Sequence, residues 1–443
     1  MRNFLPILLL ILSSVLHANI YETIEVVGKL YTSQLQSRNV VILTEKEIDL
    51  LHSDSVAEVL GSFIAVNLNR KGGAGEIYDL SMRGGNFEQV LVLINGIAYN
   101  NPQTGHFNSD FPFQVRDIRR IELIKGGSST TYGNGAYTGV INIILKREDE
   151  FRVSVSGGDK GFYEAGFGIG KSLQKFKFRV GGNKKRSDGY YSGREFDVMS
   201  VSATLSYRDK SVEMELFSGY KQNDFGAEGF YAPFSSTEEI DSIFTHLRFR
   251  KKLGNHSLTV KYAYSNHNDF FILDRTNPGL FSNESRTVQH QATMLWNSRL
   301  KRIRLSGGID FKAEQMDSLT MGIHRRQLGS LFFNLNLPLK RTGIDAGLRT
   351  TLMDGQEPNL VIYSGLYYQI TRLIKLKFST GKSFRLPSFT ELYYQSPSNR
   401  GNRELRNESN LSYEIALTVL RGKHSFDMSV YFRDQRDSID WVK

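Results

Sequence analysis

The sequence predicts a mainly β protein, in which a small N-terminal α+β domain precedes an antiparallel transmembrane β-barrel. Three observations lead to this fold class: a short apolar segment at the N-terminus, a mixed helix and strand pattern up to Lys146, and a two-residue alternation from Phe151 onward. The chain of 443 residues is also too long for one ordinary compact domain, which favours at least two.

Residues 1–18 have the pattern of a secretory signal peptide. Arg2 supplies the positive charge, and the segment from Phe4 to Leu12 is almost wholly apolar but too short to cross a bilayer as a helix. Ala18 is the expected cleavage site, and an uncleaved N-terminal anchor is the alternative. No later stretch approaches 18 consecutive apolar residues. A membrane protein built from the rest of the chain must therefore be a barrel, because only helices and closed barrels satisfy the backbone in lipid.

The composition supports strands and turns and excludes several kinds of site. Tyr and Phe are plentiful, with 21 and 29 copies, and 40 glycines stand beside only 9 prolines. The absence of cysteine excludes disulfides, thiolate metal sites and cysteine nucleophiles. The net charge is +10, but Lys and Arg are scattered rather than gathered in one block, so we expect no nucleic-acid partner.

The segment from about residue 21 to 146 predicts a compact α+β domain of about 120 residues. Thr44–Glu47 and Ser55–Glu58 both match the capping box that opens a helix. Gln89–Ile94 and Val140–Leu145 are short buried strands, and Ile118–Lys125 alternates and ends at a glycine pair. The first of these strands is followed by an Asn-Gly pair, which is a strong turn signal.

From Phe151 onward apolar and polar residues alternate in segments of about ten residues, the pattern of a barrel that is apolar outside and polar inside. Examples of this alternation are residues 151–156, 201–208, 257–264, 303–311 and 425–432. Short connections such as Arg208–Lys210 alternate with long ones such as Asp224–Ile240, as expected for short periplasmic turns and long outer loops. A soluble β-sandwich or β-solenoid is the alternative.

Part of the N-terminal domain resembles a known family. Residues 80–85 (LSMRGG), 89–97 (QVLVLINGI) and 118–146 follow, in order, the plug pattern of TonB-dependent receptors. Asn95 stands where that family usually has Asp. The resemblance implies a plug domain inside an outer-membrane barrel. It also gives structural roles to a set of plug residues: Arg83, Gly84, Gly96, Arg120, Glu122, Gly126, Gly133 and Gly139.

The later part of the chain resembles the barrel of the same family. Residues 383–393 (SFRLPSFTELY) and 401–405 are similar to its arginine–proline–glutamate stretch, with Asn407 in place of the usual Pro. The residues that carry this motif are Arg385, Pro387 and Glu391. Together the resemblances imply a signal peptide over 1–18, a TonB-box segment and linker over 19–35, a plug over 36–147 and a barrel over 148–443.

The segment before the plug resembles a TonB box, a short extended stretch that adds as an edge strand to the sheet of the energy-transducing partner TonB. It consists of Glu22, Thr23, Ile24, Glu25, Val26 and Val27. A plain linker is the alternative.

The barrel is expected to be incomplete. Only about fifteen strands can be placed after Phe151, whereas the barrels that contain a plug have 22. The last residues, Asp440 to Lys443, do not form an alternating strand with an aromatic end. We therefore expect a fragment, a split gene or a truncated product.

The resemblance implies energised import of a scarce, bulky nutrient across the bacterial outer membrane, with lipid as the surrounding medium. Phe225–Phe234 and His267–Pro278, both expected in outer loops, resemble the cobalamin-importing subgroup. The candidate ligand-binding residues are Asn69, Arg70, Tyr99, Asn100, Asn101, Gln103, His106, Asn108, Phe230 and Tyr231. For each of them, a solvated loop position is the alternative.

Other functions stay open at this point. Arg275, Arg325 and Arg326, taken as loop residues, would favour an anionic iron chelate and hence a ferric siderophore or haem receptor. A passive porin or surface adhesin, or a soluble periplasmic binding module, would lack energy coupling.

The sequence gives no support to catalysis. Glu164–Ser172 ends like a phosphate-binding loop, but Ala165 takes the place of its first glycine and strands flank it. No zinc-protease or serine-hydrolase motif is present in the sequence. We expect no cofactor, except that Asp188 and Asp197 could join a calcium site in an outer loop.

Two arginines of the plug should be buried and should therefore pair with carboxylates. For Arg83 and Arg120 we expect partners among Glu122 of the plug and the barrel glutamates Glu213 and Glu215.

Overall fold

A computed structural model describes residues 37–70, 77–147, 149–230, 233–396, 399–421 and 424–441. The predicted signal peptide and TonB box lie outside the described residues. So does Tyr231, one of the candidate ligand residues.

The N-terminal domain is the predicted α+β unit. Its strands are β1 (Asn39–Thr44), β2 (Val66–Arg70), β3 (Tyr78–Met82), β4 (Val90–Ile94), β5 (Ile97–Ala98), β6 (Ile118–Lys125) and β7 (Gly139–Leu145). Its helices are α2 (Glu45–Leu51), α3 (Val56–Gly61) and α4 (Ser129–Tyr132), with 3-10 turns η2 (Phe87–Gln89), η3 (Gly105–Ser109) and η4 (Val115–Asp117). The five-stranded sheet has the order β1-β6-β7-β4-β5, with β4 and β7 parallel, and β2 pairs with β3.

Local sequence explains the ends of these elements. Thr44 opens α2 with the predicted capping box. At α3 only half of the predicted box forms: Ser55 accepts from the Glu58 N–H, but the Glu58 carboxylate accepts from the N–H of Asp54 instead. Asn95 and Gly96 both have positive φ, so the predicted turn closes β4 onto β5.

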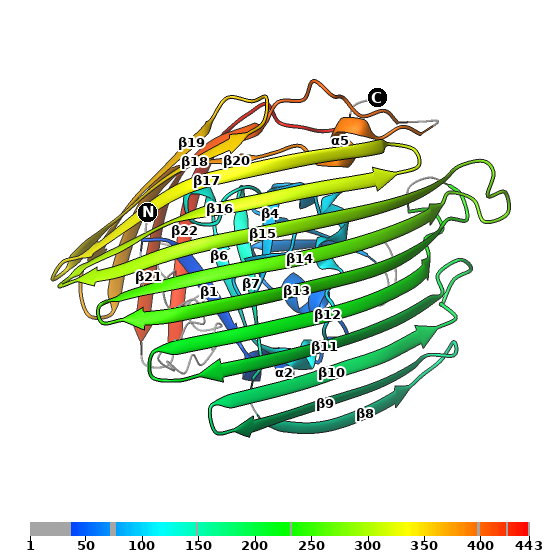
Figure 1. Ribbon diagram of the computed structural model, residues 1–443, viewed down its shortest axis with the longest axis horizontal. Helices are drawn as coiled ribbons and strands as arrows, with labels where there is room; N and C mark the ends of the chain where they lie inside the picture. Colours follow the sequence, from blue (N-terminus) through cyan, green and yellow to red (C-terminus); the bar gives the residue numbers. More distant parts are fainter. Residues whose placement is uncertain are drawn as a thin grey trace, which may run out of the picture.

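The rest of the chain forms one antiparallel sheet of fifteen strands, as predicted (Figure 1). These strands are β8 (Glu150–Gly157), β9 (Tyr163–Leu173), β10 (Phe176–Ser187), β11 (Phe196–Arg208), β12 (Val212–Gly226), β13 (Thr237–Leu253), β14 (His256–Ile272), β15 (Ser282–Leu300), β16 (Ile303–Ser318), β17 (Gly322–Pro338), β18 (Thr342–Met353), β19 (Asn359–Gln369), β20 (Ile374–Arg385), β21 (Glu408–Arg421) and β22 (His424–Arg436). Each strand pairs with the next along the chain, and β8 and β22 are the two edge strands in the described part of the chain. Helix α5 (Phe389–Tyr393) lies between β20 and β21. We call this sheet the wall.

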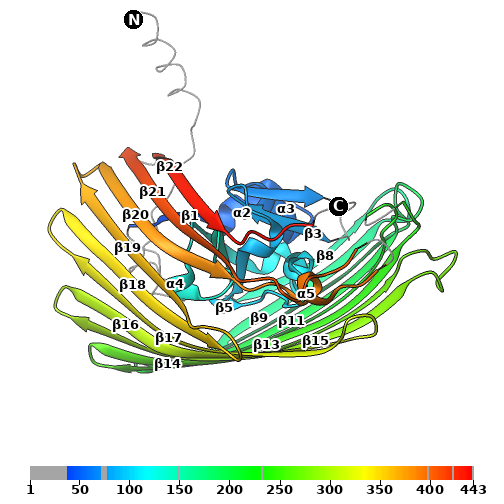
Figure 2. The same ribbon diagram turned by 90° about the horizontal axis from the view of Figure 1, so that it is seen from above.

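The wall curves into a trough, and the plug lies on its concave side (Figure 2). The main apolar core of the plug extends to the wall through Phe217, Phe244 and Ala263. The plug is therefore packed against the wall, as the family resemblance implied.

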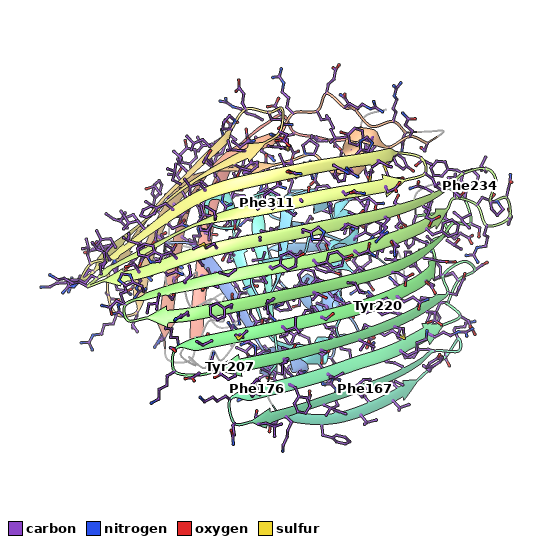
Figure 3. All side chains as sticks on the ribbon, viewed as in Figure 1. Phe167, Phe176, Tyr207, Tyr220, Phe234 and Phe311 are labelled. Carbon is purple, nitrogen blue, oxygen red and sulfur yellow. The ribbon has the colours of Figure 1, made fainter. Side chains whose placement is uncertain are left out.

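The two faces of the wall differ as the alternation predicts. On β11, Ser200, Ser202 and Thr204 are buried on the concave side, whereas Val201 and Leu205 are exposed on the convex side. Figure 3 shows aromatic side chains on the same wall, with Phe176 and Tyr207 at the end where the turns are short and Phe234 at the opposite end. An apolar convex face above a polar concave face is the arrangement that a lipid-embedded barrel wall requires.

Several strands are longer than the sequence indicated. The connection predicted over Asp224–Ile240 is only 227–236, because β12 and β13 extend past both of its ends. The first six residues of His267–Pro278 belong to β14, and Arg325 and Arg326 belong to β17, so their assignment to loops was wrong. Polar residues still pair in a backbone ladder, so hydrophobicity alone does not mark where these strands end.

Among the residues that the structure describes, no helix combines the length and apolar character needed to cross a membrane.

Candidate functional site

The interface between plug and wall contains a bidentate ion pair. Arg83 follows β3 and donates from Nη1 and Nη2 to the two carboxylate oxygens of Glu414 on β21, at 2.8 Å each. The guanidinium also lies over the Tyr431 ring, 4.5 Å from its centre. The expectation that Arg83 is buried and pairs with a carboxylate is confirmed, but its partner is neither of the wall glutamates predicted for it.

The second predicted arginine is satisfied within the plug. Arg120 and Glu122 lie on the same side of β6, and Arg120 Nη2 is 2.8 Å from Glu122 Oε1. Asn142 of β7 donates to the other carboxylate oxygen at 2.9 Å. Glu122 is thus the carboxylate partner of Arg120, as expected.

The two wall glutamates proposed from the sequence have other partners. Glu215 forms ion pairs with Arg147 and Arg248 and contacts His246 at 3.1 Å. Glu213 lies closer to the short turns, where its carboxylate is 3.0 Å from Lys252 Nζ. Neither glutamate reaches Arg83 or Arg120. The alternation of apolar and polar residues could not predict this, because it shows which face of a strand a side chain occupies but not how far along the wall it lies.

A third contact region lies at the start of the described plug. Ser37 donates its backbone N–H to Asp345 of β18 at 2.9 Å. Arg38 donates to the carbonyl of Gly127 at 2.5 Å, and its guanidinium lies 3.7 Å from the centre of the Tyr363 ring. The sequence reasoning missed Arg38, Asp345 and Glu414. The useful signal was an acidic residue at a concave-side position of an alternating strand, as Asp345 and Glu414 both are.

The predicted plug glycines occupy constrained positions. Gly84, Gly96, Gly126 and Gly133 have positive φ. Gly139 does not, but a Cβ atom there would lie 2.5 Å from Met82 Cε and 2.9 Å from the Ile124 carbonyl oxygen.

The barrel motif forms a second buried network, next to the plug. Arg385 donates to both carboxylate oxygens of Glu391, at 2.7 and 2.9 Å, and to Glu408 at 2.6 Å. Gln89 of the plug donates to the same Glu408 oxygen at 2.9 Å. Pro387, the third residue of the motif, accepts from Arg326 at 2.8 Å.

The segment after Arg385 then bonds directly to the plug backbone. The N–H groups of Phe389 and Thr390, in α5, donate to the carbonyls of Pro102 and Gln103 at 2.9 and 3.0 Å. The connection between β20 and β21 thus lies over the plug and holds it by main-chain hydrogen bonds.

Beneath this connection lies an acidic plug residue, Glu88. Its carboxylate accepts from the Gly105 N–H at 2.8 Å and from the Thr104 hydroxyl at 3.2 Å. Burial and the nearby Glu391 carboxylate raise the pKa of Glu88 to about 7, although the Arg385 guanidinium opposes this.

A cavity of about 150 Å³ lies between the plug and β14–β18. On the plug side it is lined by residues 131–135, and on the wall side by alternating charges of β16, Asp310, Lys312 and Glu314. Arg349 of β18 also lines it. Charged side chains of the wall therefore line a space beside the plug, although the plug also bonds directly to β14 and β18.

Two family models match the chain over most of its length. The TonB-dependent receptor plug domain matches residues 32–140, and the TonB-dependent receptor-like β-barrel matches residues 125–443. This chain belongs to the TonB-dependent receptor family.

Relatives and solved structures agree with this assignment. The chain is 25% identical over 430 residues to the vitamin B12 transporter BtuB of Vibrio vulnificus, covering 91% of this chain and 68% of that protein. It is 24% identical to the vitamin B12 transporter BtuB of Photobacterium profundum, covering 90% of this chain and 67% of the relative. A mutant of the ferric enterobactin receptor PfeA of Pseudomonas aeruginosa superposes with a TM-score of 0.75 at 17% identity, covering 91% and 72% of the two chains.

Membership of the TonB-dependent receptor family shows the general role of the molecule. It is an outer-membrane receptor of a transport family rather than of an enzyme family, and TonB-dependent receptors interact with TonB and import ligands.

The structure gives most of the receptor's candidate ligand residues internal contacts. The Asn100 amide bonds the backbone of Val92 and Val90 at 2.7 and 2.8 Å. Buried Gln103 donates to Asp269 of β14 at 2.9 Å, and buried Asn108 accepts from the Asn101 N–H at 3.0 Å.

The aromatic candidates Tyr99 and His106 also form contacts within the protein. Tyr99 donates its hydroxyl to the Asp110 carbonyl at 2.5 Å and packs edge-on against Phe244. His106 contacts Asp79 at 2.5 Å and stacks on Phe87.

The remaining candidates lie at two further places. Asn69 and Arg70 are exposed at the end of β2, and Phe230, between β12 and β13, lies under the guanidinium of Arg194. Contact of any candidate with ligand stays a prediction.

The proposed calcium ligands of the receptor face cations instead of each other. Asp197 forms an ion pair with Lys184, and Asp188 lies 3.6 Å from Arg186. In the described ranges, no group of three or more His, Asp or Glu side chains is placed to hold a metal ion. Calcium binding stays a prediction.

Proposed function

We propose that this receptor imports cobalamin across the outer membrane, by TonB-driven displacement of the plug. The observation that carries the proposal is the similarity, over 91% of the chain, to a vitamin B12 transporter. Asn100 and Asn101 support it, since both line the cavity between plug and wall, where amide groups suit a bulky, largely neutral ligand.

Energy coupling is assigned to Glu22–Val27. An extended segment of this kind gains main-chain hydrogen bonds by adding to the edge of a partner's sheet, and it places few demands on side chains. A pull on this segment reaches β1 through residues 28–38, and Ser37 and Arg38 are the first described residues that hold the plug to the wall.

The contacts named above suit a plug that must move and return. Many are ion pairs or hydrogen bonds, such as Arg83–Glu414 and Gln89–Glu408, which form again when their partners come back into register. The charged cavity along β14–β18 supplies water-accessible space beside residues 131–135. We propose that ligand passes on this side once the plug shifts.

The test is ligand binding and uptake by the full chain. Calorimetry with cyanocobalamin should give saturable binding to the purified receptor, and ferric enterobactin should give none. In cells that lack their own cobalamin receptor, the chain should support cobalamin-dependent growth, and deletion of residues 22–27 should abolish growth while leaving binding intact.

The rival functions predict different results. Binding of the ferric chelate alone would make the chain a siderophore receptor, the function named for the structural relative from Pseudomonas. Growth that survives the deletion would mean passage without energy coupling, as in a passive porin, and growth without any ligand binding would contradict the proposal altogether.

A further inference from the structure

The short turns of the wall carry a regular series of cations. Six turns lie within the described residues, and each has an exposed Lys or Arg at or beside its tip. These cations, which we call the basic rim, are Lys175, Lys210, Lys252, Lys301, Lys340 and Arg372. In outer-membrane barrels the short turns face the periplasm, so the basic rim lies at the periplasmic boundary of the membrane.

The opposite end of the wall is different. Its longer connections mix both signs of charge, with Asp188, Glu228, Asp274 and Asp354 beside Arg194 and Arg275. The positive charge is therefore a property of one end of the wall rather than of the whole surface.

Few carboxylates neutralise the basic rim. Lys175 pairs with Asp209 at 2.8 Å, and Lys252 pairs with Glu213 at 3.0 Å. Within the described residues, Lys301, Lys340 and Arg372 form no ion pair with a carboxylate. Two of these three turns place a second exposed cation directly after the first, Arg302 and Arg341. Adjacent like charges repel one another, so an anionic surface would stabilise them.

Apolar side chains accompany these cations. Leu253, Leu300, Leu339 and Leu373, all at the short turns, are each about half exposed. The aromatic side chains of Phe176 and Tyr207 lie at the same end of the wall (Figure 3). A soluble acidic protein would pair with the cations but would leave these leucines and aromatic rings, which follow the curved edge of the wall, exposed to water. A lipid boundary accepts both parts, with the aliphatic groups at the acyl chains and the cations at the phosphates.

We infer that the basic rim selects anionic phospholipids from the periplasmic leaflet, binding their phosphate headgroups at the short turns. Each turn supplies a cation at headgroup depth, and Leu253, Leu300, Leu339 and Leu373 add an aliphatic side chain beside four of these cations. The receptor is then surrounded, on this side, by anionic lipid in excess of its share in the bilayer.

The chain contains a natural reporter for this inference. Trp296 on β15 is 40% exposed on the convex face and precedes Lys301 by five residues, about 17 Å of strand. The acyl chains of a lipid whose headgroup contacts Lys301 pass this indole. Trp441→Phe leaves Trp296 as the single tryptophan, because the chain has only two.

The experiment compares quenching of Trp296 by brominated phosphatidylglycerol and by brominated phosphatidylcholine. The full chain carrying Trp441→Phe is reconstituted in phosphatidylcholine vesicles with either quencher. At low salt the apparent association of phosphatidylglycerol should exceed that of phosphatidylcholine roughly threefold, and in about 1 M salt the ratio should fall toward one.

Two matched variants locate the effect. Lys301→Gln/Arg302→Gln should bring the low-salt ratio close to one. Arg400→Gln/Arg406→Gln removes the same charge from two exposed positions of the connection between β20 and β21 and should leave the ratio unchanged. Circular dichroism checks that both variants keep the β content of the parent. A low-salt ratio near one in the parent, or an unchanged ratio in Lys301→Gln/Arg302→Gln, would overturn the inference and leave an acidic protein as the occupant to seek.

Discussion

The ion pair between Arg83 and Glu414 offers the sharpest test of how the plug is held. We predict that Glu414→Gln destabilises the docked plug by about 3 kcal/mol. The two side chains are only 6% and 10% exposed, and both guanidinium nitrogens donate to the carboxylate at 2.8 Å. Removing the charge of one partner leaves the other buried and uncompensated.

The magnitude follows from what remains after the change. Breaking a buried pair costs about 3–5 kcal/mol when the remaining charge has no partner. Glutamine keeps one carbonyl oxygen for Arg83, and the guanidinium keeps its contact with the Tyr431 ring. The lower end of the range is therefore expected, and about 3 kcal/mol corresponds to a roughly 150-fold larger population of undocked plug.

Native-state hydrogen exchange in detergent measures this population directly. Amides of β6 and β7 should exchange roughly 150-fold faster in Glu414→Gln, while amides of the wall strands keep their protection. Glu213→Gln is the control, since its ion pairs are near the short turns, and it should cost less than about 1 kcal/mol. Arg83→Leu/Glu414→Leu should recover much of the loss, because no unpaired charge remains. A change below about 1 kcal/mol in Glu414→Gln would refute the reasoning.

Three further predictions concern the plug and its contacts. Burial raises the pKa of Glu88 to about 7, so the folded state keeps this proton to a higher pH than the unfolded state does. Thermal stability in detergent should therefore fall as the pH rises from about 4.5 to about 7, and then level off. The Glu88→Gln variant should lose this dependence of stability on pH. Phe244→Ala opens a cavity where the plug meets the wall and should lower the free energy of unfolding by about 3–5 kcal/mol in urea titrations. A decrease below about 1 kcal/mol would contradict the packing of Tyr99 on this ring. Gly139→Ala forces a methyl group against Met82 and the Ile124 carbonyl and should cost about 1–3 kcal/mol by the same titration. A neutral result would contradict the close approach of Gly139 to Met82 and Ile124.

The fold was largely predictable because its signals are local. Ile118–Lys125 is β6 to the residue, and the two-residue alternation identified the wall and the face that each side chain takes. Strand ends were not predictable in the same way. Residues such as His267 and Arg326 are polar but still pair in the backbone ladder, so their composition resembled that of loops.

The site was predictable in kind but not in its pairing. Burial of Arg83 and its need for a carboxylate followed from its place in the plug. The choice of Glu414, 331 residues away, depends on the height of each concave-side carboxylate along the curved wall. Glu213, Glu215 and Glu414 share the same alternating pattern, and only the three-dimensional register distinguishes them.

If ligand enters only when the plug moves against the wall, a reversible tether between plug and wall should stop import. Gly347 of β18 faces Thr130 of α4, and a Cβ atom at 347 would lie 3.2 Å from Thr130 Cβ, so the two need to move apart by only a few tenths of an ångström to reach the range that disulfides span. Since the chain has no cysteine, Thr130→Cys/Gly347→Cys introduces a single cross-link. Ser218→Cys/Thr245→Cys, between paired residues of β12 and β13, is the control within the wall.

Uptake of labelled cobalamin by cells that express each variant gives the answer. We predict that the oxidised plug–wall cross-link abolishes uptake, that a reductant restores it, and that the control transports normally in both states. Normal uptake through a receptor whose plug is shown by gel shift to be fully cross-linked to β18 would mean that ligand passes without movement of the plug.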